Sequence, residues 1–235
     1  MGRAHTVRQR VERLIRVCPP VARLAYRARY GPFGPCLADT SSIPSWLTRQ
    51  EGLALAAASY ALPPHAVVVE IGSFLGKSAI WLAAARRRRG SGTLHSIDPF
   101  DASGDAFSTP IYRSIADRDT RTLRQRFDNN IARAGLTRWV NVHQGTAESV
   151  ASQWTEAIDM LFLDGDQSPA GVTLTFTAWS RFLKVRGILA LHNSNEREYA
   201  PGHDGHYRLA RQLTELGQYG DIRCVDSITF ARKLA

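Results

Sequence analysis

From residue 66 onward, the chain alternates short apolar runs with longer mixed segments, and this alternation restricts its fold more than any other feature. The runs have the composition of buried strands, and the segments between them are long enough for right-handed helical crossovers. Five expected strands are Ala66–Ile71, Thr93–Ile97, Trp139–His143, Ile158–Leu163 and Gly187–Leu191, and a closing pair is Asp221–Val225 and Ser227–Arg232. The pattern predicts an α/β fold with a doubly wound, Rossmann-like, mostly parallel seven-stranded sheet.

Segments of helical character separate the apolar runs. They are Lys77–Arg88, Arg118–Ala134, Ala147–Trp154, Val172–Leu183 and His206–Leu216. Because they alternate with parallel strands, we expect them to cover both faces of the sheet.

The first part of the chain has a different pattern. Apolar residues of Val7–Val17 recur at helical spacing between arginines, which predicts an amphipathic helix that ends at Pro19-Pro20. An irregular stretch surrounds Gly31–Pro35, and a further helix is expected over residues 48–62, before Pro63-Pro64. We therefore divide the chain into an N-terminal helical extension, residues 1–62, and an α/β domain, residues 63–235. The amphipathic helix favours docking on its own domain or in a homodimer over binding to a membrane surface.

The composition suits a single globular unit in a reducing compartment. A chain of 235 residues with 44% hydrophobic content can bury a full core without disulfides. Its cysteines, Cys18, Cys36 and Cys224, are widely spaced and match no metal-binding pattern, so a cytoplasmic location is expected. Arginines interrupt the apolar residues near the N-terminus, and we expect neither a signal peptide nor a transmembrane segment.

The formal charge of +9 raises nucleic acid as a partner, but the charge distribution argues against a dedicated nucleic-acid module. Arginines are spread along the chain, and no basic stretch is interleaved with stacking aromatic residues. The densest run, Arg86–Arg89, lies at an expected helix end, where it would complement the helix dipole as a solvated terminus. Nucleic acid is therefore an unlikely partner.

The turn after the first expected strand is rich in glycine. It reads Glu70-Ile71-Gly72-Ser73-Phe74-Leu75-Gly76-Lys77-Ser78, in which Gly72 and Gly76 permit a tight turn and a close backbone approach to a ligand. A phosphate-binding P-loop has one more residue between its glycines, and Phe74 excludes the dinucleotide pattern GxGxxG. The segment resembles motif I, ExGxxxGxS, of class I S-adenosylmethionine-dependent methyltransferases.

This resemblance implies a site for S-adenosyl-L-methionine. It implies that the motif I acid and glycine backbone hold the amino acid part of the cofactor. Asp98, at the end of the second strand, would accept hydrogen bonds from both ribose hydroxyls. Residues 144–148 resemble the family segment that borders the adenine. The cofactor-binding residues expected on this basis are Glu70, Gly72, Ser73, Phe74, Gly76, Ser78, Asp98, Thr146, Ala147, Glu148 and Asp164.

The ends of the fourth and fifth strands carry the most specific match. The segments 158–168 and 187–193, together with Trp179 and Leu183, resemble a branch of these enzymes that includes macrocin-type and related sugar O-methyltransferases. The resemblance covers roughly residues 66–233. That branch usually has DGDHSY and HD at these places, whereas this chain has Gln167 for the histidine and Asn193 for the aspartate.

These departures bear on metal binding. Asp164, His192 and Asn193 could form a mixed oxygen and nitrogen site for Mg²⁺, which in metal-dependent members lies at these strand ends. Histidine suits magnesium less well than carboxylate and water oxygens do, and the sequence leaves metal dependence open.

Methyl transfer to a hydroxyl requires a group that removes the proton. The catalytic candidates are His192, Asp164, His203 and His206. A carboxylate such as Asp166 or Asp204 could orient a histidine and raise its basicity. Alternatively, His203 and His206 are polar loop residues, with His206 starting a helix.

The sequence therefore indicates an S-adenosylmethionine-dependent O-methyltransferase whose acceptor is a small molecule, a sugar or a glycosylated metabolite. Three alternatives stay open: an N-methyltransferase on an aminosugar, an RNA methyltransferase, and a cofactor-binding scaffold whose catalytic end has decayed. The substitutions at Gln167 and Asn193 motivate the last of these.

Overall fold

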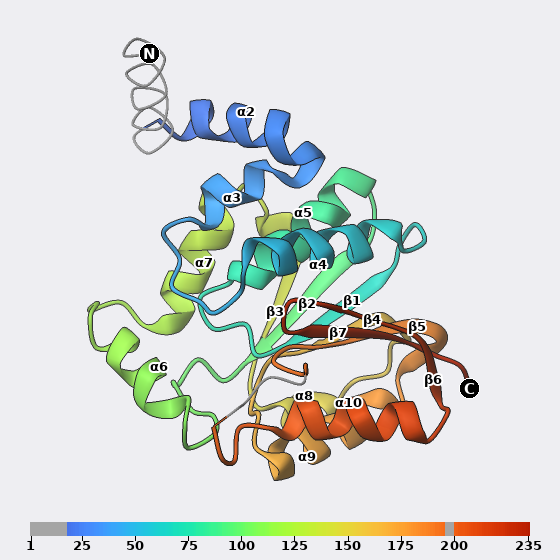
Figure 1. The fold of residues 1–235 in the computed structure, drawn as a ribbon. Coiled ribbons are helices and arrows are strands. Elements are labelled where there is room, and N and C mark those ends of the chain that lie inside the picture. Colours follow the sequence, from blue (N-terminus) through green and yellow to red (C-terminus); the bar gives the residue numbers. More distant parts are fainter. Residues whose placement is uncertain (1–17, 196–199) are drawn as a thin grey trace, which may run out of the picture.

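The computed structural model describes residues 18–195 and 200–235, and its centre is a seven-stranded sheet (Figure 1). The strand order is β3-β2-β1-β4-β5-β7-β6. The strands are β1 (Val67–Ile71), β2 (Thr93–Asp98), β3 (Val140–Gln144), β4 (Ile158–Leu163), β5 (Leu183–Leu191), β6 (Tyr219–Val225) and β7 (Ile228–Lys233). All seven expected strands are present, with ends shifted by a few residues.

Strands β1 to β5 run parallel, and only β7 enters the sheet in the opposite direction. Strand β1 is central: Val69 pairs with His95 of β2 on one side and with Leu161 of β4 on the other. The strand order therefore reverses beside β1, between the first and second halves of the fold. In parallel sheets, ligands bind outside the carboxyl ends of the strands at such a reversal.

Helices cover both faces of the sheet, as expected (Figure 1). On one face lie α4 (Arg49–Ala61), α5 (Lys77–Arg89) and α7 (Leu123–Arg133); on the other lie α8 (Ala147–Ala151), α9 (Pro169–Ser180) and α10 (Gly205–Glu215). Each face has its own apolar core, with Trp81 and Phe162 fully buried in the first and Trp179 and Leu189 in the second. Burial of such large side chains supplies most of the favourable free energy of folding.

Some helical segments differ from the sequence-based expectation. A helix that was not expected, α2 (Pro19–Tyr30), begins at Pro19-Pro20, because proline suits the first helical turn. The helix expected over Val7–Val17 lies outside the described residues. A short helix, α6 (Thr109–Ala116), also has a proline, Pro110, in its first turn and was not expected. Helix α7 starts later than expected, at Leu123, because Thr122 and Gln125 form a capping box there.

The N-terminal segment packs onto the first face of the sheet. Helix α3 (Pro35–Thr40) and the 3₁₀ turn η1 (Gly31–Phe33) lie between α2 and α5, and a second 3₁₀ turn, η2 (Thr137–Trp139), precedes β3. Leu55 of α4 and Phe33 belong to the same buried cluster as β1. The extension thus shares a core with the α/β domain, and the boundary at residue 62 stays a prediction. No helix within residues 18–195 and 200–235 is long and apolar enough to cross a bilayer.

Candidate active site

The glycine turn after β1 lies against the backbone that follows β4. Gly72 has φ +88°, and its amide donates to the carbonyl of Ile97 over 2.9 Å. A Cβ at this position would lie 2.4 Å from the carbonyl oxygen of Asp164, closer than any side chain tolerates. Only glycine therefore allows the ends of β1, β2 and β4 to approach one another here.

Asp98, at the end of β2, is bound to this same turn. Its Oδ2 accepts hydrogen bonds from the backbone amides of Ser73 and Phe74, both over 2.8 Å, and its Oδ1 accepts one from Phe100 over 2.6 Å. Burial raises the pKa of this carboxyl, although the three amides act against the rise. Gly72 and Asp98, expected to share one site, are thus brought together.

Glu70 lies behind the turn rather than in front of it. The side chain is fully buried, and its Oε2 accepts hydrogen bonds from the hydroxyls of Ser73 (2.8 Å) and Ser96 (3.0 Å). Burial raises its pKa to about 7 despite these hydroxyls. Its Oε1 is buried without a hydrogen-bond partner. The carboxyl of Glu70 therefore fixes the position of the turn through its hydrogen bond with the hydroxyl of Ser73.

A cavity of about 400 Å³ opens over the carboxyl ends of the strands. Nine of the eleven residues that the sequence assigns to the cofactor line it: Gly72, Ser73, Phe74, Ser78, Asp98, Thr146, Ala147, Glu148 and Asp164. Glu70 and Gly76 are not part of its lining; Gly76 instead starts α5 with φ +83°. A volume of this size is typical of small-molecule sites.

The segment after β3 reaches the cavity because it is anchored to β2. The amide of Gly145 donates to the carbonyl of Asp98 over 3.1 Å, and the hydroxyl of Thr146 caps α8 by accepting from the amide of Ser149. The Oε1 atom of Glu148 accepts from the hydroxyl of Thr175 at 3.5 Å. Strand ends β1, β2 and β3 thus face the same space.

His192 follows β5 and lies between two carboxylates. Its Nδ1 is 2.6 Å from Oδ1 of Asp164, and its Nε2 is 3.6 Å from Oε2 of Glu51, which comes from α4. Burial opposes a charge on the ring, but the two carboxylates outweigh it and raise the pKa of His192 to about 10. The side chain is therefore an imidazolium at neutral pH, and it has no free lone pair with which to accept a proton.

Two of the three expected magnesium ligands, Asp164 and His192, pair with each other, and the magnesium site stays a prediction. The amide group of Asn193 donates to Oε1 of Gln167 over 3.1 Å, and both nitrogens of His192 face carboxylates. A metal ligand needs an available lone pair; Nδ1 of His192 is engaged by Asp164, whereas its Nε2 faces Glu51 at 3.6 Å without a hydrogen bond. Across the described part of the chain, no group of three His, Cys, Asp or Glu side chains is arranged to hold a metal ion.

His203 also lines the cavity at the strand ends. Its Nδ1 is 3.1 Å from Oδ2 of Asp105, and the hydroxyl of Ser108 lies 3.5 Å from the same nitrogen. Although Asp105 is buried, hydrogen bonds from His203 and Ser108 hold the pKa of its carboxyl below the usual range. Asp105 is therefore ionised, and it can orient His203 and stabilise a positive charge on its ring.

The orienting carboxylates expected from the sequence are engaged elsewhere. Asp204 accepts from Arg208 over 2.8 Å, and Asp166 accepts from the amide of Ser168 over 2.8 Å. His206 is buried, and its Nδ1 lies 2.8 Å from the carbonyl oxygen of His192, to which it donates. Burial lowers the pKa of His206 to about 3. His206 does not line the cavity, so the structure places it as a neutral packing residue at the start of α10.

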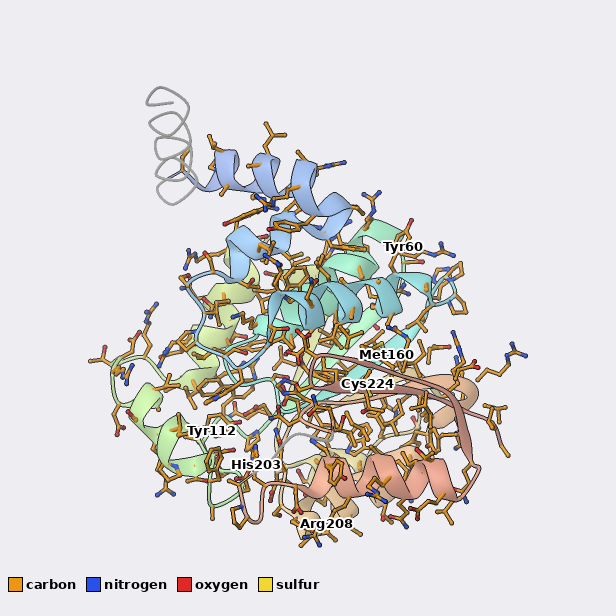
Figure 2. All side chains as sticks on the ribbon, in the orientation of Figure 1. Tyr60, Tyr112, Met160, His203, Arg208 and Cys224 are labelled. Atoms are coloured by element: carbon orange, nitrogen blue, oxygen red, sulfur yellow. The ribbon has the colours of Figure 1, made fainter. Side chains whose placement is uncertain are left out.

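Aromatic side chains form the outer wall of the cavity, and sequence reasoning did not identify them. Tyr112 of α6 contacts Phe74 and Trp46, with ring centroids 4.9 and 5.4 Å apart, and Phe107 lies 4.9 Å from the ring of His203. Figure 2 shows Tyr112 and His203 at the same end of the molecule, beside α6. Trp46 and Phe107 are about half exposed. They offer flat apolar surfaces to a bound ring.

Comparison with known proteins identifies the family and the fold of the chain. Residues 69–194, more than half of the chain, match the family described as "Methyltransferase domain". The fold is similar to that of cofactor-bound Rv0187 from MTB, with a TM-score of 0.62, 16% identity, and 92% of this chain and 96% of that one covered. It is also similar to the O-methyltransferase TomG from Streptomyces achromogenes in complex with SAM, with a TM-score of 0.59, 18% identity, and coverage of 86% and 88%.

A third similar structure is the O-methyltransferase from Bacillus cereus in complex with SAH, with a TM-score of 0.58, 16% identity, and 89% of this chain and 96% of that one covered. At these identities the likeness concerns the fold. The family match spans the glycine turn, Asp98, Asp164 and His192. The chain belongs to the methyltransferase-domain family and has the class I fold of S-adenosylmethionine-dependent methyltransferases.

Proposed function

We propose that the protein is an S-adenosylmethionine-dependent O-methyltransferase that acts on a hydroxyl of a small ring-shaped acceptor, a sugar or a glycosylated metabolite. One observation carries the proposal: a single cavity joins the glycine turn and Asp98 to a histidine, His203, that is oriented by an ionised carboxylate. Cofactor-binding residues and a basic group that line one cavity suit transfer between two bound molecules.

The cofactor half consists of the residues at the ends of β1, β2 and β3. Gly72 lets the turn lie against the backbone of Asp164, so that the turn and Asp98 line the same cavity, and Glu70 holds Ser73 of the turn by a hydrogen bond. Asp98 would accept from the ribose hydroxyls, and residues 146–148 would border the adenine. When bound, S-adenosylmethionine supplies a methyl group activated by a positively charged sulfur.

His203 is the group that we assign as general base. It would accept the proton of the acceptor hydroxyl, and the neighbouring carboxylate of Asp105, 3.1 Å away, would stabilise the imidazolium that results. His192 does not suit this role, since Asp164 and Glu51 already hold its ring in the protonated form. We assign His192 to the positioning of Asp164 at the cavity floor.

The acceptor half lies between α6 and the segment before α4. Trp46, Phe107 and Tyr112 line it, and polar groups of Ser45, Asn193 and His203 lie among them. The C–H faces of a sugar ring pack on aromatic rings while its hydroxyls need polar partners, and this lining offers both. A phenol without a sugar would contact only the aromatic side chains of this lining.

Similar structures support O-methylation as the class of reaction. TomG and the protein from Bacillus cereus are each described as O-methyltransferases, in complex with SAM and SAH respectively. Sequence identities of 18% and 16% support a shared fold but do not identify the acceptor. The choice of a sugar as acceptor therefore rests on the cavity lining and on the sequence resemblance.

A methyl-transfer assay tests the proposal. The purified full chain is incubated with S-adenosylmethionine that carries a labelled methyl group. The matched acceptors are a phenol, its glycoside, the same phenol linked to an aminosugar, and total RNA. We expect label on a sugar oxygen of the glycoside and none on the free phenol. Label on RNA or only on an amino group would replace the proposal with one of the alternatives. Binding of the cofactor without transfer to any acceptor in the panel would contradict the proposed acceptor class.

A further inference from the structure

A second cavity, of about 460 Å³, lies beside the C-terminal half of α5, whereas the glycine turn precedes the N-terminus of this helix. It is bounded by α2, the 3₁₀ turn η1, α3 and the last turn of α5, which stack together on the first face of the sheet (Figure 1). It shares no lining residue with the cavity at the strand ends. Nothing in the proposed methyl transfer uses it.

The lining of this cavity is strongly positive. Its charged residues are Arg23, Arg27, Arg87, Arg88 and Asp39. One charge is neutralised, because Nη1 of Arg23 lies 2.9 Å from Oδ1 of Asp39. No carboxylate within the described residues lies at ion-pair distance from the other three guanidinium groups. Like charges gathered around one hollow repel each other, and an anion relieves that repulsion.

Two of the arginines are held in place by the protein. Nη1 of Arg87 donates to the carbonyls of Ala134 and Gly135, over 3.1 and 3.4 Å, and the guanidinium of Arg88 lies 5.9 Å from the ring centroid of Tyr60. Tyr60, labelled in Figure 2, lies at the same end of the molecule as these helices. A guanidinium that is already ordered loses less conformational entropy when it binds a ligand.

The run Arg86–Arg89 therefore has more than one role, which the expectation of a solvated helix end did not include. Arg86 is fully buried and donates to the carbonyls of Ser59 and Pro63, so it joins α4 to α5. Arg87 and Arg88 are exposed, as expected of a solvated helix end, and they also line the second cavity. The dipole at a helix C-terminus is equivalent to only about half an elementary charge, so it does not balance the excess of arginines.

We propose that the cavity between α2, α3 and α5 binds a phosphate-bearing ligand through Arg23, Arg27, Arg87 and Arg88. Planar guanidinium groups match the oxygens of a phosphoryl or pyrophosphate group with paired hydrogen bonds. The apolar wall formed by Phe33, Pro32 and Pro35 would contact the remainder of the ligand. A phosphorylated metabolite and a phospholipid headgroup share this chemistry.

Calorimetric titration of the full chain with inorganic pyrophosphate tests the site. The cavity variant carries Arg27→Gln and Arg88→Gln, neither of which removes a hydrogen bond seen between described residues. The matched control carries Arg181→Gln and Arg223→Gln, which remove the same charge from exposed arginines that lie over aromatic rings outside the cavity. We expect the cavity variant to lose at least about tenfold in affinity, and the control to stay within about twofold of the original chain.

Sedimentation with vesicles distinguishes the two sources of phosphate. Vesicles that contain phosphatidylglycerol are compared with vesicles of phosphatidylcholine alone, with the same variants. Pyrophosphate binding without selective vesicle binding identifies a soluble ligand, whereas binding to anionic vesicles that the cavity variant loses identifies a headgroup. The proposal is overturned if the original chain binds neither probe, or if the cavity and control variants weaken binding equally, which would indicate only a general effect of net charge.

Discussion

The Oδ2 atom of Asp98 accepts a hydrogen bond from the backbone amide of Ser73 over 2.8 Å. The bond joins the end of β2 to the glycine turn after β1, so the expected diol-binding acid and the expected cofactor turn form one unit. A carboxylate that already fixes two amides of the turn is also pre-oriented toward the cavity that it lines. Preorganised acceptors of this kind lower the cost of ordering a site when a ligand binds.

Replacement of Gly72 by alanine is expected to destabilise the fold by about 3 kcal/mol or more. The new Cβ would meet the backbone of Asp164 at 2.4 Å, and the position also requires φ +88°. Urea denaturation measures the loss. Gly90→Ala is the matched control, because Gly90 has a similar φ of +79° but nothing within 4 Å of its Cβ position, so it should cost only about 1 kcal/mol. Equal losses in the two variants would mean that the close approach at Gly72 is unimportant.

Substitution His203→Gln is expected to lower kcat by about 100-fold or more while cofactor affinity is kept, because it removes the proposed base. Asp105→Asn should lower kcat in the same direction, since its carboxylate stabilises the imidazolium of His203. Steady-state kinetics on an identified acceptor provide the measurement. The exposed His65 lies outside the cavity, and His65→Asn serves as the control. Full turnover in the His203 variant would remove this residue from the mechanism.

Stability is expected to fall as the pH rises from about 6.5 to about 10 through the titration of His192. In the unfolded chain the imidazole releases its proton near pH 6.5, whereas the folded protein keeps it until about pH 10. The folded state thus binds more protons in this window, so the contribution of His192 is complete below pH 6.5 and is lost as the pH approaches 10. Urea midpoints between these pH values, compared with His192→Gln, measure the effect. Parallel curves for the two proteins would show that His192 is not protonated in the fold.

Methyl transfer is expected to continue in EDTA and to gain nothing from added Mg²⁺. The reason is geometric: Nδ1 of His192 contacts Asp164 at 2.6 Å, its Nε2 faces Glu51 at 3.6 Å, and the amide nitrogen of Asn193 donates to Gln167. The transfer assay is run after dialysis against EDTA, with and without restored Mg²⁺. Activity that disappears in EDTA and returns with magnesium would mean that these side chains rearrange around a metal.

Sequence alone predicted the sheet, since runs such as Ile158–Leu163 are apolar at every position except Asp159 and are buried on both faces. The glycine turn and Asp98 could also be found, because each lies directly at a strand end. Contacts between distant segments could not be predicted in this way. The T-x-x-E pattern at Thr48 and Glu51 indicates a helix start, and the structure contains that capping box. The sequence gives no sign that the same Glu51 also reaches His192 and Ser227.

The acceptor side illustrates the same limit. Asp105 orients His203 across a long sequence separation, so the nearby Asp204 and Asp166 were the natural candidates and are engaged elsewhere. Trp46, Phe107 and Tyr112 lie in irregular or short helical segments without a periodic pattern. Their shared position depends on how these segments fold over the strand ends, which is a property of tertiary packing.

Calorimetric titration with S-adenosylhomocysteine, the demethylated product of the cofactor, tests the central claim most directly. The original chain is expected to bind it at a single site, and Asp98→Ala is expected to weaken binding at least about tenfold, since it removes the acceptor that joins the turn to β2. The neighbouring exposed Asp101→Ala should bind as the original chain does. A folded chain that takes up no S-adenosylhomocysteine, or an Asp98 variant with unchanged affinity, would contradict the assignment of this cavity to the cofactor.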